Sequence, residues 1–358
     1  MFPPECSTLR LPVACTFLAA ISPVQADALQ SEITSAWTLA EQRAEETFDW
    51  MDSTLGDPLM YSRYPTLGNN ATGRWTLTNL NRDWRDGYWP GILWMLAERT
   101  GSEIWRQRAT DWTIPLEATT NIDHDIGFIT LTSLGKGLLH HDELTDPDNV
   151  YRDFAKAAVL TAAAKLEARF NKPNAFGDPV PAGFTRSWNT PFQDPYPVCI
   201  DNLMNLEVLF LAYELDGCQT GQRVWFDHAL QHARSTIARH MRPDGGTYHV
   251  VKHFETGPHV GTVERKHTWQ GFAAESTWSR GQAWAIHGFT MVHRHASRDP
   301  TSCRPRISMP RQESRSGHGT TRTSTTTPPP SPASVTAGPR RLPSPRGIRP
   351  QPPSQHQA

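Results

Sequence analysis

Residues 86–109, DGYWPGILWMLAERTGSEIWRQRA, and residues 201–229, DNLMNLEVLFLAYELDGCQTGQRVWFDHA, share one layout. Each stretch begins with an aspartate, continues as an apolar helix, passes a Glu and then a Gly, and ends in a second helix with Trp and Ala. The first helix is apolar nearly all round, which predicts burial, and the second is amphipathic, which predicts one face in water. Gly101 and Gly217 stand where a helix C-terminus needs a left-handed residue. Such pairs repeated around a ring predict an all-α fold, an α/α barrel with inner and outer helices.

Helical spacing continues through the body of the chain, from Ser31 to about Ala296. Apolar residues recur every three or four positions in SAWTLAEQRAEETFDWM (35–51), YRDFAKAAVLTAAAKLEARF (151–170) and FDHALQHARSTIARHM (226–241). This is the period of an amphipathic helix, and runs that alternate as strands do are scarce. We therefore predict one barrel domain over residues 27–296.

The composition changes abruptly after about residue 298. From there to residue 358 the chain has no aromatic residue and no lysine, and is rich in Arg, Pro, Ser and Thr. Such a segment buries too little apolar area to offset its chain entropy, so we predict a disordered tail over residues 297–358. We expect this tail to stand in place of the last barrel helices, as an out-of-frame or mis-spliced end would, which predicts a C-terminally incomplete barrel.

The N-terminal stretch LRLPVACTFLAAISPVQADA (9–28) has an arginine, an apolar run, and small residues before Asp27. This pattern is typical of a cleavable secretory signal, which we predict over residues 1–26. We expect secretion if the signal is used and a cytoplasmic location otherwise. No other segment is apolar for long enough to span a bilayer.

Composition excludes some classes of partner and site. The formal net charge is −1, which gives no electrostatic reason to expect nucleic acid or an anionic membrane. The five cysteines show neither metal-ligand spacing nor a disulfide framework, so we expect free thiols. Thirteen tryptophans suit a cleft that stacks sugar rings, although packing alone could use them.

In a barrel of this kind the inner helices start at one shared end, which collects the residues that open them. Polar or aromatic groups stand at four such starts, residues 83–89, 123–128, 201–202 and 278–284. A helix start needs only one capping residue. We therefore predict a reaction centre at this end.

Asp125 and Asp201 are the predicted catalytic residues. Two carboxyl groups in unlike environments can divide the roles of proton donor and base. Burial can raise a carboxyl pKa by several units, whereas a helix N-terminus favours the anion by roughly 1 kcal/mol, so one carboxyl group can keep its proton while the other stays charged. The alternative is that both residues only cap their helices, with Asp123 competing for that task beside Asp125.

Further polar residues surround this predicted centre. Arg280 lies between two tryptophans and can grip a carboxylate with two hydrogen bonds, although an ordinary ion pair, for instance with Glu275, is the alternative. His249 and Gln270 lie in predicted loops, where functional residues collect. His124 is expected to be a hydrogen-bonded helper. We predict no metal site, because no second ligand stands at metal-site spacing and an EF-hand reading of DHDIG lacks its later ligands.

Taken together, six stretches resemble the unsaturated glucuronyl hydrolases of glycoside hydrolase family 88. They are DWRDGYWPGILW, HDIGF, IDNLMNL, DGGTYH, QGFAAESTWSRGQAW and the AIHGF that follows, in the order of that family, over roughly residues 35 to 295. The resemblance implies an (α/α)6 barrel and a monomeric enzyme without metal or other cofactor. It also implies release of 4,5-unsaturated uronic acid from the non-reducing end of oligosaccharides left by polysaccharide lyases.

The resemblance also assigns residues. The family's catalytic aspartates fall on Asp125 and Asp201, and its substrate-binding residues fall on Trp84, His124, His249, Gln270, Trp278, Arg280 and Trp284. In the implied mechanism Asp201 gives a proton to C4 of the enol-ether double bond and assists water onto C5. The hemiketal that forms then collapses and breaks the glycosidic link, while Asp125 positions and stabilises.

Two departures from the family stand out. Many relatives have Thr-His before the Gln-Gly, whereas this chain has Thr268 and Trp269, which is expected to alter a subsite. The last helical hairpins of the family's barrel are absent, so the ring should stay open and the chain should fold poorly or be inactive. Two other functions remain open: an unsaturated rhamnogalacturonyl hydrolase on the same barrel, and a non-catalytic sugar-binding remnant.

Overall fold

The computed structural model describes residues 23–80, 83–118, 123–138, 140, 149–171, 183–188, 196–218, 221, 223–255 and 257–297. The chain divides into two units, residues 1–309 and 310–358, and every described residue belongs to the first unit. The predicted signal up to residue 22 and the predicted tail from residue 298 lie outside the described residues. The predicted incompleteness of the barrel concerns the segment after residue 297, so it also lies outside the described residues.

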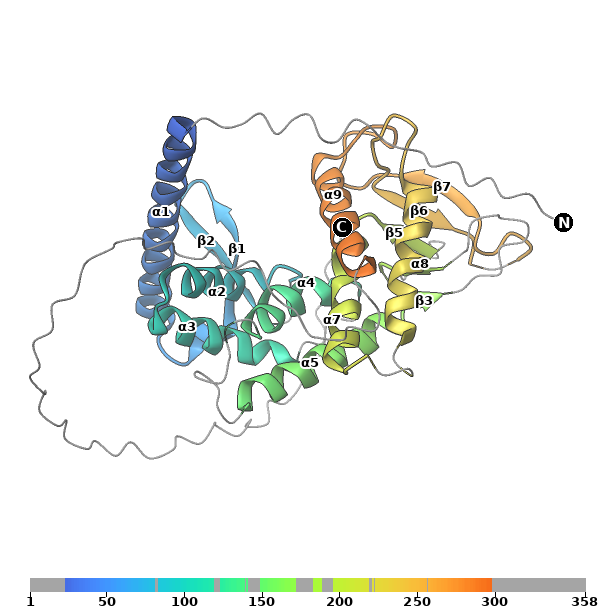
Figure 1. Ribbon diagram of the computed structural model, residues 1–358. Coiled ribbons are helices and arrows are strands. Elements are labelled where there is room, and N and C mark those ends of the chain that lie inside the picture. Colours follow the sequence, from blue (N-terminus) through green and yellow to red (C-terminus); the bar gives the residue numbers. More distant parts are fainter. Residues whose placement is uncertain are drawn as a thin grey trace, which may run out of the picture. The chain divides into compact units, whose positions relative to one another are not determined.

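The described part is mostly helical, as predicted (Figure 1). Its α-helices are α1 (Pro23–Leu55), α2 (Tyr88–Thr100), α3 (Glu103–Thr113), α4 (Ile126–Thr130), α5 (Val150–Glu167), α6 (Asn202–Asn205), α7 (Glu207–Leu215), α8 (Arg223–His240) and α9 (Ser279–Ala296). Short 3-10 turns cover Leu59–Ser62 and Ile114–Ala118, and a π-helical turn covers Leu131–Gly135. The predicted helix starts at residues 83–89, 123–128, 201–202 and 278–284 coincide with the beginnings of α2, α4, α6 and α9.

Three small antiparallel sheets accompany the helices, and the sequence pattern did not predict them. The strands are β1 (Arg63–Asn69) with β2 (Arg74–Asn79), β3 (Phe170–Asn171) with β4 (Phe184–Thr185), and β5 (Tyr196–Cys199), β6 (Val250–His253) and β7 (Val263–His267) in the order β5-β6-β7. All four residues of β5 and of β6 are buried. Strands covered on both faces read as short apolar runs without alternation, which periodicity does not separate from buried helix.

The helical pairs of the sequence form as expected. Helices α2 and α3 pack side by side, and so do α7 and α8. Gly101 follows α2 with φ 66°, and Gly217 follows α7 with φ 69°, the left-handed conformation that tolerates glycine best.

The core explains many of the tryptophans. Trp94, Trp105 and Trp112 are almost fully buried, and the indole N–H of Trp94 donates to the Thr113 hydroxyl at 2.9 Å. These rings pack the interior and are not available to sugars.

The cysteines are not uniformly free thiols. Cys199 is free and buried, but Cys218 is disulfide-bonded, which corrects the expectation from spacing.

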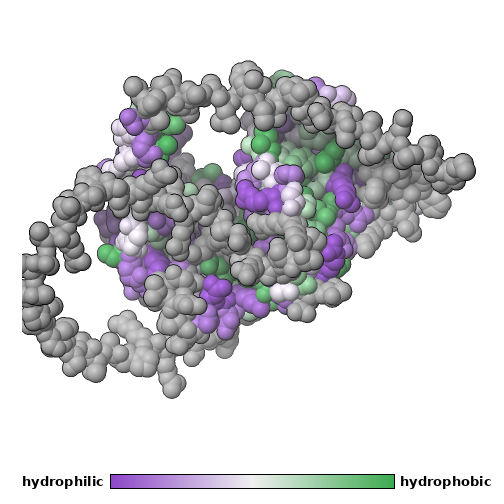
Figure 2. Space-filling view, in the orientation of Figure 1, coloured by the Kyte–Doolittle hydropathy of each residue, from purple (hydrophilic) through white to green (hydrophobic). Residues whose placement is uncertain are grey.

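On the face drawn in Figure 2, hydrophilic residues occupy much of the described surface and hydrophobic residues show between them. Among the described residues, no helix combines the length and the apolar character that a bilayer crossing requires.

Candidate active site

The two predicted catalytic aspartates each stand directly before a short helix. Asp125 precedes α4 and Asp201 precedes α6, yet neither side chain makes a capping hydrogen bond. The Asp123 carboxylate accepts a hydrogen bond from the backbone N–H of Asp125 at 2.9 Å. Capping therefore does not account for either carboxylate, and the alternative of two simple caps is wrong.

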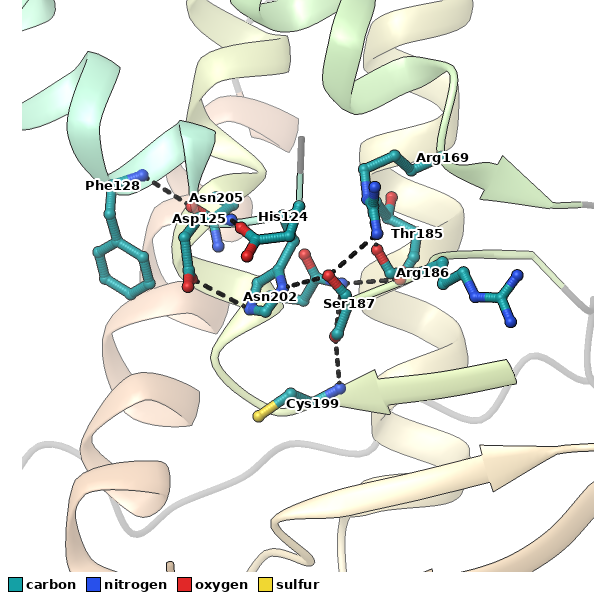
Figure 3. A network of polar contacts seen from close by, with 11 residues as sticks. His124, Asp125, Phe128, Arg169, Thr185, Arg186, Ser187, Cys199, Asn202 and Asn205 are labelled. Carbon is teal, nitrogen blue, oxygen red and sulfur yellow. Dashed lines mark hydrogen bonds and ion pairs between the residues drawn. The ribbon is translucent and has the colours of Figure 1, made fainter. Parts of the chain in front are cut away.

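Asp125 contacts a buried histidine. The Nε2 atom of His124 lies 3.1 Å from Oδ1 of Asp125, and Nδ1 of His124 lies 2.8 Å from the backbone oxygen of Ser187 (Figure 3). Since a carbonyl oxygen only accepts, Nδ1 carries a proton, and Nε2 faces the Asp125 carboxyl group.

The electrostatic surroundings of Asp125 favour its protonated form. Burial raises the pKa of Asp125 from 3.8 to about 6; His124 opposes the shift, and the charges of Asp123, Asp201 and Asp83 add to it. A carboxyl group with such a pKa holds a substantial fraction of its protons near pH 6.

Asp201 lies in a second polar group. Its carboxylate, the Cys199 thiol and a ring nitrogen of His249 lie within 4.8 Å of one another. Burial raises the pKa of Asp201, while His124, the Cys199 thiol and Arg280 work against the shift. Within the described part of the chain, Oδ1 of Asp201 is buried and has no hydrogen-bond partner. The charge of Asp201 also raises the pKa of Asp125.

His249 offers a donor to this group. Its Nδ1 accepts the backbone N–H of Trp269 at 3.2 Å, so its ring proton sits on Nε2, which is buried without a partner among the described residues. Burial, with His267 and Arg280, lowers the pKa of His249 to about 4, so the ring is neutral at pH 7. A protonated Nε2 has no lone pair for a metal ion, which leaves Cys199 and Asp201 as the ligand atoms of this cluster.

Arg280 supplies the positive charge. Its guanidinium lies over the Trp278 ring, 4.5 Å from the centroid, and donates to the Gln270 side-chain oxygen. Among the described residues it forms no ion pair with a carboxylate, and Glu275 instead accepts a hydrogen bond from Tyr248 at 3.0 Å. The ion-pair alternative is therefore wrong for Glu275, and the exposed guanidinium is available to an anion.

Aromatic rings line the same end of the helices. Phe128 of α4 contacts Trp84 at 5.3 Å and Trp284 of α9 at 5.4 Å between ring centroids. Tyr88 also packs on Trp84 at 5.8 Å, and burial and the charges of both predicted aspartates raise its pKa. Tyr88 thus lies close to both carboxylates, although the sequence reasoning did not select it.

The predicted residues fall into two neighbouring groups, both in the described part. Trp84, Asp125 and Trp284 gather around Phe128 and His124, whereas Gln270, Trp278 and Arg280 gather around His249 beside Asp201. Sequence reasoning missed the residues that hold these groups in place, Ser187, Cys199 and Asn205. Asn205 is the second asparagine of IDNLMNL (200–206), one helical turn after Asn202. This repeat is the one signal that could have identified it.

A cavity of about 570 Å³ lies elsewhere, lined by Lys165, Arg169, Arg186, Tyr196 and Glu255 among others. Neither Asp125 nor Asp201 lines it. The candidate active site is therefore assigned to the aspartate pair.

Comparisons with known proteins point to one enzyme group. The chain is 38% identical over 221 residues to an unsaturated glucuronyl hydrolase of Formosa agariphila, covering 61% of this chain and 49% of the relative. It is 34% identical over 242 residues to an unsaturated glucuronyl hydrolase of Bacillus sp. strain GL1, covering 65% of this chain and 57% of the relative. No family model matches.

Solved structures agree. A crystal structure of an unsaturated glucuronyl hydrolase specific for heparin matches with a TM-score of 0.57 and 31% identity, over 72% of this chain and 62% of that one. The Bacillus sp. GL1 enzyme, described as responsible for glycosaminoglycan degradation, matches with a TM-score of 0.58 and 28% identity, over 73% and 63%. The chain spans about half the length of the curated relatives it matches.

Proposed function

Given its homology to the unsaturated glucuronyl hydrolases, we propose that this chain releases 4,5-unsaturated uronic acid from the non-reducing end of lyase-generated oligosaccharides. One observation carries the proposal. Two largely buried carboxyl groups with raised pKa values stand at neighbouring helix starts, and neither of them caps its helix. That arrangement suits proton transfer more than structural support.

In the proposed reaction Asp201 is the proton donor. An enol ether accepts a proton at C4, which leaves positive charge shared between C5 and the ring oxygen. Water adds to C5 as the resulting Asp201 carboxylate removes its proton. The hemiketal then opens by breaking the bond between C5 and the ring oxygen, which leaves a ketone at C5 and a hemiacetal at C1. Collapse of this hemiacetal to an aldehyde breaks the glycosidic bond, and the next sugar leaves as an alcohol. Asp125, which lies beside His124, positions the sugar and stabilises the charge that develops.

The substrate's carboxylate belongs beside Arg280 in this proposal. A guanidinium without a carboxylate partner in the described residues, backed by the indole of Trp278 and steadied by Gln270, provides two parallel donors for a planar acid. His249 adds a neutral N–H donor nearby. This group would distinguish an unsaturated uronic acid from a neutral unsaturated sugar.

Turnover of a lyase digest tests the proposal. The protein is incubated with an unsaturated uronyl disaccharide while the ultraviolet absorbance of the conjugated double bond is followed. The account predicts that absorbance falls as reducing sugar appears. Calorimetry with Asp201→Asn separates an enzyme from a sugar-binding remnant, because a remnant binds the disaccharide equally well and never consumes the double bond.

The comparisons bear on the alternative substrate. The relatives favour glucuronyl substrates, so an unsaturated rhamnogalacturonyl hydrolase is not favoured. We further propose that the protein acts as a monomer without nucleic acid, and that residues 1–26 direct its secretion. Size-exclusion chromatography with light scattering, and analysis of the secreted fraction, test these two points.

A further inference from the structure

Arg169 binds a stretch of backbone beside the candidate active site. It lies between the end of α5 and the start of β3. Its Nε atom donates a hydrogen bond to the backbone oxygen of Arg186 at 2.9 Å, and its Nη2 atom donates to the backbone oxygen of Ser187 at 3.0 Å. Because the donors of a guanidinium form a rigid fork, these two bonds fix the orientation of both carbonyl groups.

The Ser187 carbonyl oxygen is also the acceptor that holds His124. It accepts the backbone N–H of His124 at 3.2 Å and the ring Nδ1–H at 2.8 Å. Figure 3 shows Arg169 and His124 approaching Ser187 from different sides. The other ring nitrogen of His124 lies 3.1 Å from the Asp125 carboxyl group. One chain of contacts therefore runs from the guanidinium to a predicted catalytic residue.

Ser187 is joined to the second aspartate as well. Its backbone N–H donates to the Pro197 oxygen at 2.9 Å, and its hydroxyl accepts the backbone N–H of Cys199 at 2.8 Å. Cys199 stands two residues before Asp201. A shift of the Ser187 backbone would therefore reach the surroundings of both aspartates.

The guanidinium can be reached without passing through the site. Arg169 is half-buried and lines the cavity of about 570 Å³ described above, to which neither predicted catalytic aspartate contributes. Truncation to alanine would extend this cavity toward the Ser187 backbone. A small planar cation from solution can then take the place of the missing side chain.

Arg186 provides a matched comparison. Its side chain lines the same cavity, but its guanidinium pairs with the Glu255 carboxylate at 2.7 and 2.9 Å. Figure 3 shows this side chain directed away from Ser187. Truncation of Arg186 therefore removes a guanidinium next to Ser187 in the sequence, while the bonds of the Ser187 carbonyl group stay in place.

We propose that Arg169 is a positioning residue for the reaction: its guanidinium holds the Ser187 carbonyl group to which His124 is bonded, and through His124 it sets the place of the Asp125 carboxyl group. The inference rests on the proposed function. Because the substrate's carboxylate is assigned to Arg280 and not to Arg169, loss of Arg169 should lower kcat and leave KM nearly as it is.

Steady-state kinetics on an unsaturated uronyl disaccharide measures this division. For Arg169→Ala, kcat should fall roughly 10-fold to 100-fold, the loss that a small misplacement of a reacting group causes, and KM should change by less than about threefold. Arg169→Lys should lose less, because lysine keeps a charged donor although it lacks the fork. Arg186→Ala should retain the wild-type constants.

Chemical rescue separates positioning from a general loss of stability. Millimolar guanidinium chloride should restore part of the kcat of Arg169→Ala, whereas sodium chloride at the same concentration should not, and neither salt should activate Arg186→Ala. A wild-type kcat in Arg169→Ala, an equal loss in Arg186→Ala, or equal effects of the two salts would overturn the proposal and leave the function intact.

A measurement without substrate keeps the two proposals apart. If the wild type does not consume the disaccharide, the proposed function fails, and the nuclear magnetic resonance signal of the proton on His124 Nδ1 then decides the role of Arg169. The signal is assigned by its loss in His124→Gln. Its exchange with water should be faster in Arg169→Ala than in the wild type and in Arg186→Ala. Equal exchange in all three proteins would refute the positioning role.

Discussion

The side-chain oxygen of Asn205, in α6, accepts a hydrogen bond from the backbone N–H of Phe128, in α4, at 2.7 Å. This contact joins the two short helices that Asp201 and Asp125 precede. The approach is close because residue 127 is a glycine that lies directly against Asn205. The geometry of the carboxylate pair therefore depends on a contact that involves neither carboxylate.

Gly127→Ala should disturb this contact. A Cβ atom at residue 127 would lie 2.6 Å from the Asn205 Cα atom, so the backbone must shift, and overpacking of this kind costs about 1–3 kcal/mol. We expect a lower midpoint of thermal unfolding and reduced turnover. Gly135→Ala is the control, since its Cβ would have 3.5 Å to the nearest atom. Equal stability of the two variants would contradict the account.

Asp125→Asn should stabilise the protein at neutral pH. The folded-state pKa of about 6 exceeds the ordinary 3.8, so between pH 4 and 6 the folded state binds more protons than the unfolded state and loses stability as the pH rises. A difference of two units corresponds to about 3 kcal/mol at most. The amide side chain of the variant does not titrate, so the variant does not lose this free energy of unfolding as the pH rises. It should also be inactive, because it lacks the Asp125 carboxyl group.

Urea unfolding at several pH values measures this effect. The difference in unfolding free energy between Asp125→Asn and the wild type should grow from pH 4 to pH 6 and then level off. Buried histidines such as His232, with a pKa lowered to about 3, lose stability as the pH falls, but they do so equally in both proteins. A difference that does not vary with pH would refute the raised pKa.

Ser187→Ala should destabilise the site. The Ser187 hydroxyl accepts the backbone N–H of Cys199 at 2.8 Å and the Asn202 side-chain amide at 3.3 Å (Figure 3). Removal leaves buried donors unsatisfied, at a cost of about 1–3 kcal/mol. The exposed Ser53→Ala should change stability by less than about 0.5 kcal/mol. A similar denaturant midpoint for both variants would show that the hydroxyl has no such role.

Arg280→Lys should weaken substrate binding more than catalysis. Lysine keeps the charge but loses the paired donors that match a carboxylate. KM for the unsaturated disaccharide should rise roughly tenfold or more, with a smaller change in kcat. Arg294→Lys, in the last turn of the same helix, should behave as the wild type. Steady-state kinetics on the two variants decides the point.

Much of the helical plan could be predicted from sequence, because it depends on local signals. The left-handed glycines after α2 and α7 and the polar starts of α4 and α6 are patterns within a few residues. The strand β5 could not be predicted, since its burial on both faces comes from residues about fifty positions away. Fold class and family resemblance both agree with the comparisons.

The residues of the candidate site could likewise be predicted only in part. Motifs identified the aspartates and Arg280, but periodicity carries no information about Ser187, whose role depends on contacts with β5, α6 and His124. Burial of Tyr88 beside both aspartates likewise arises only on folding. The roles assigned to the individual site residues stay predictions.

The rate at which the double bond disappears in Asp201→Asn tests the central claim most directly. Equal amounts of wild type, Asp201→Asn and the surface control Asp227→Asn are mixed with the unsaturated disaccharide, and absorbance loss is followed. The account predicts wild-type rates for Asp227→Asn and a loss of roughly 100-fold to 10,000-fold for Asp201→Asn. Consumption of the double bond by Asp201→Asn at the wild-type rate would contradict the assignment of Asp201 as the proton donor.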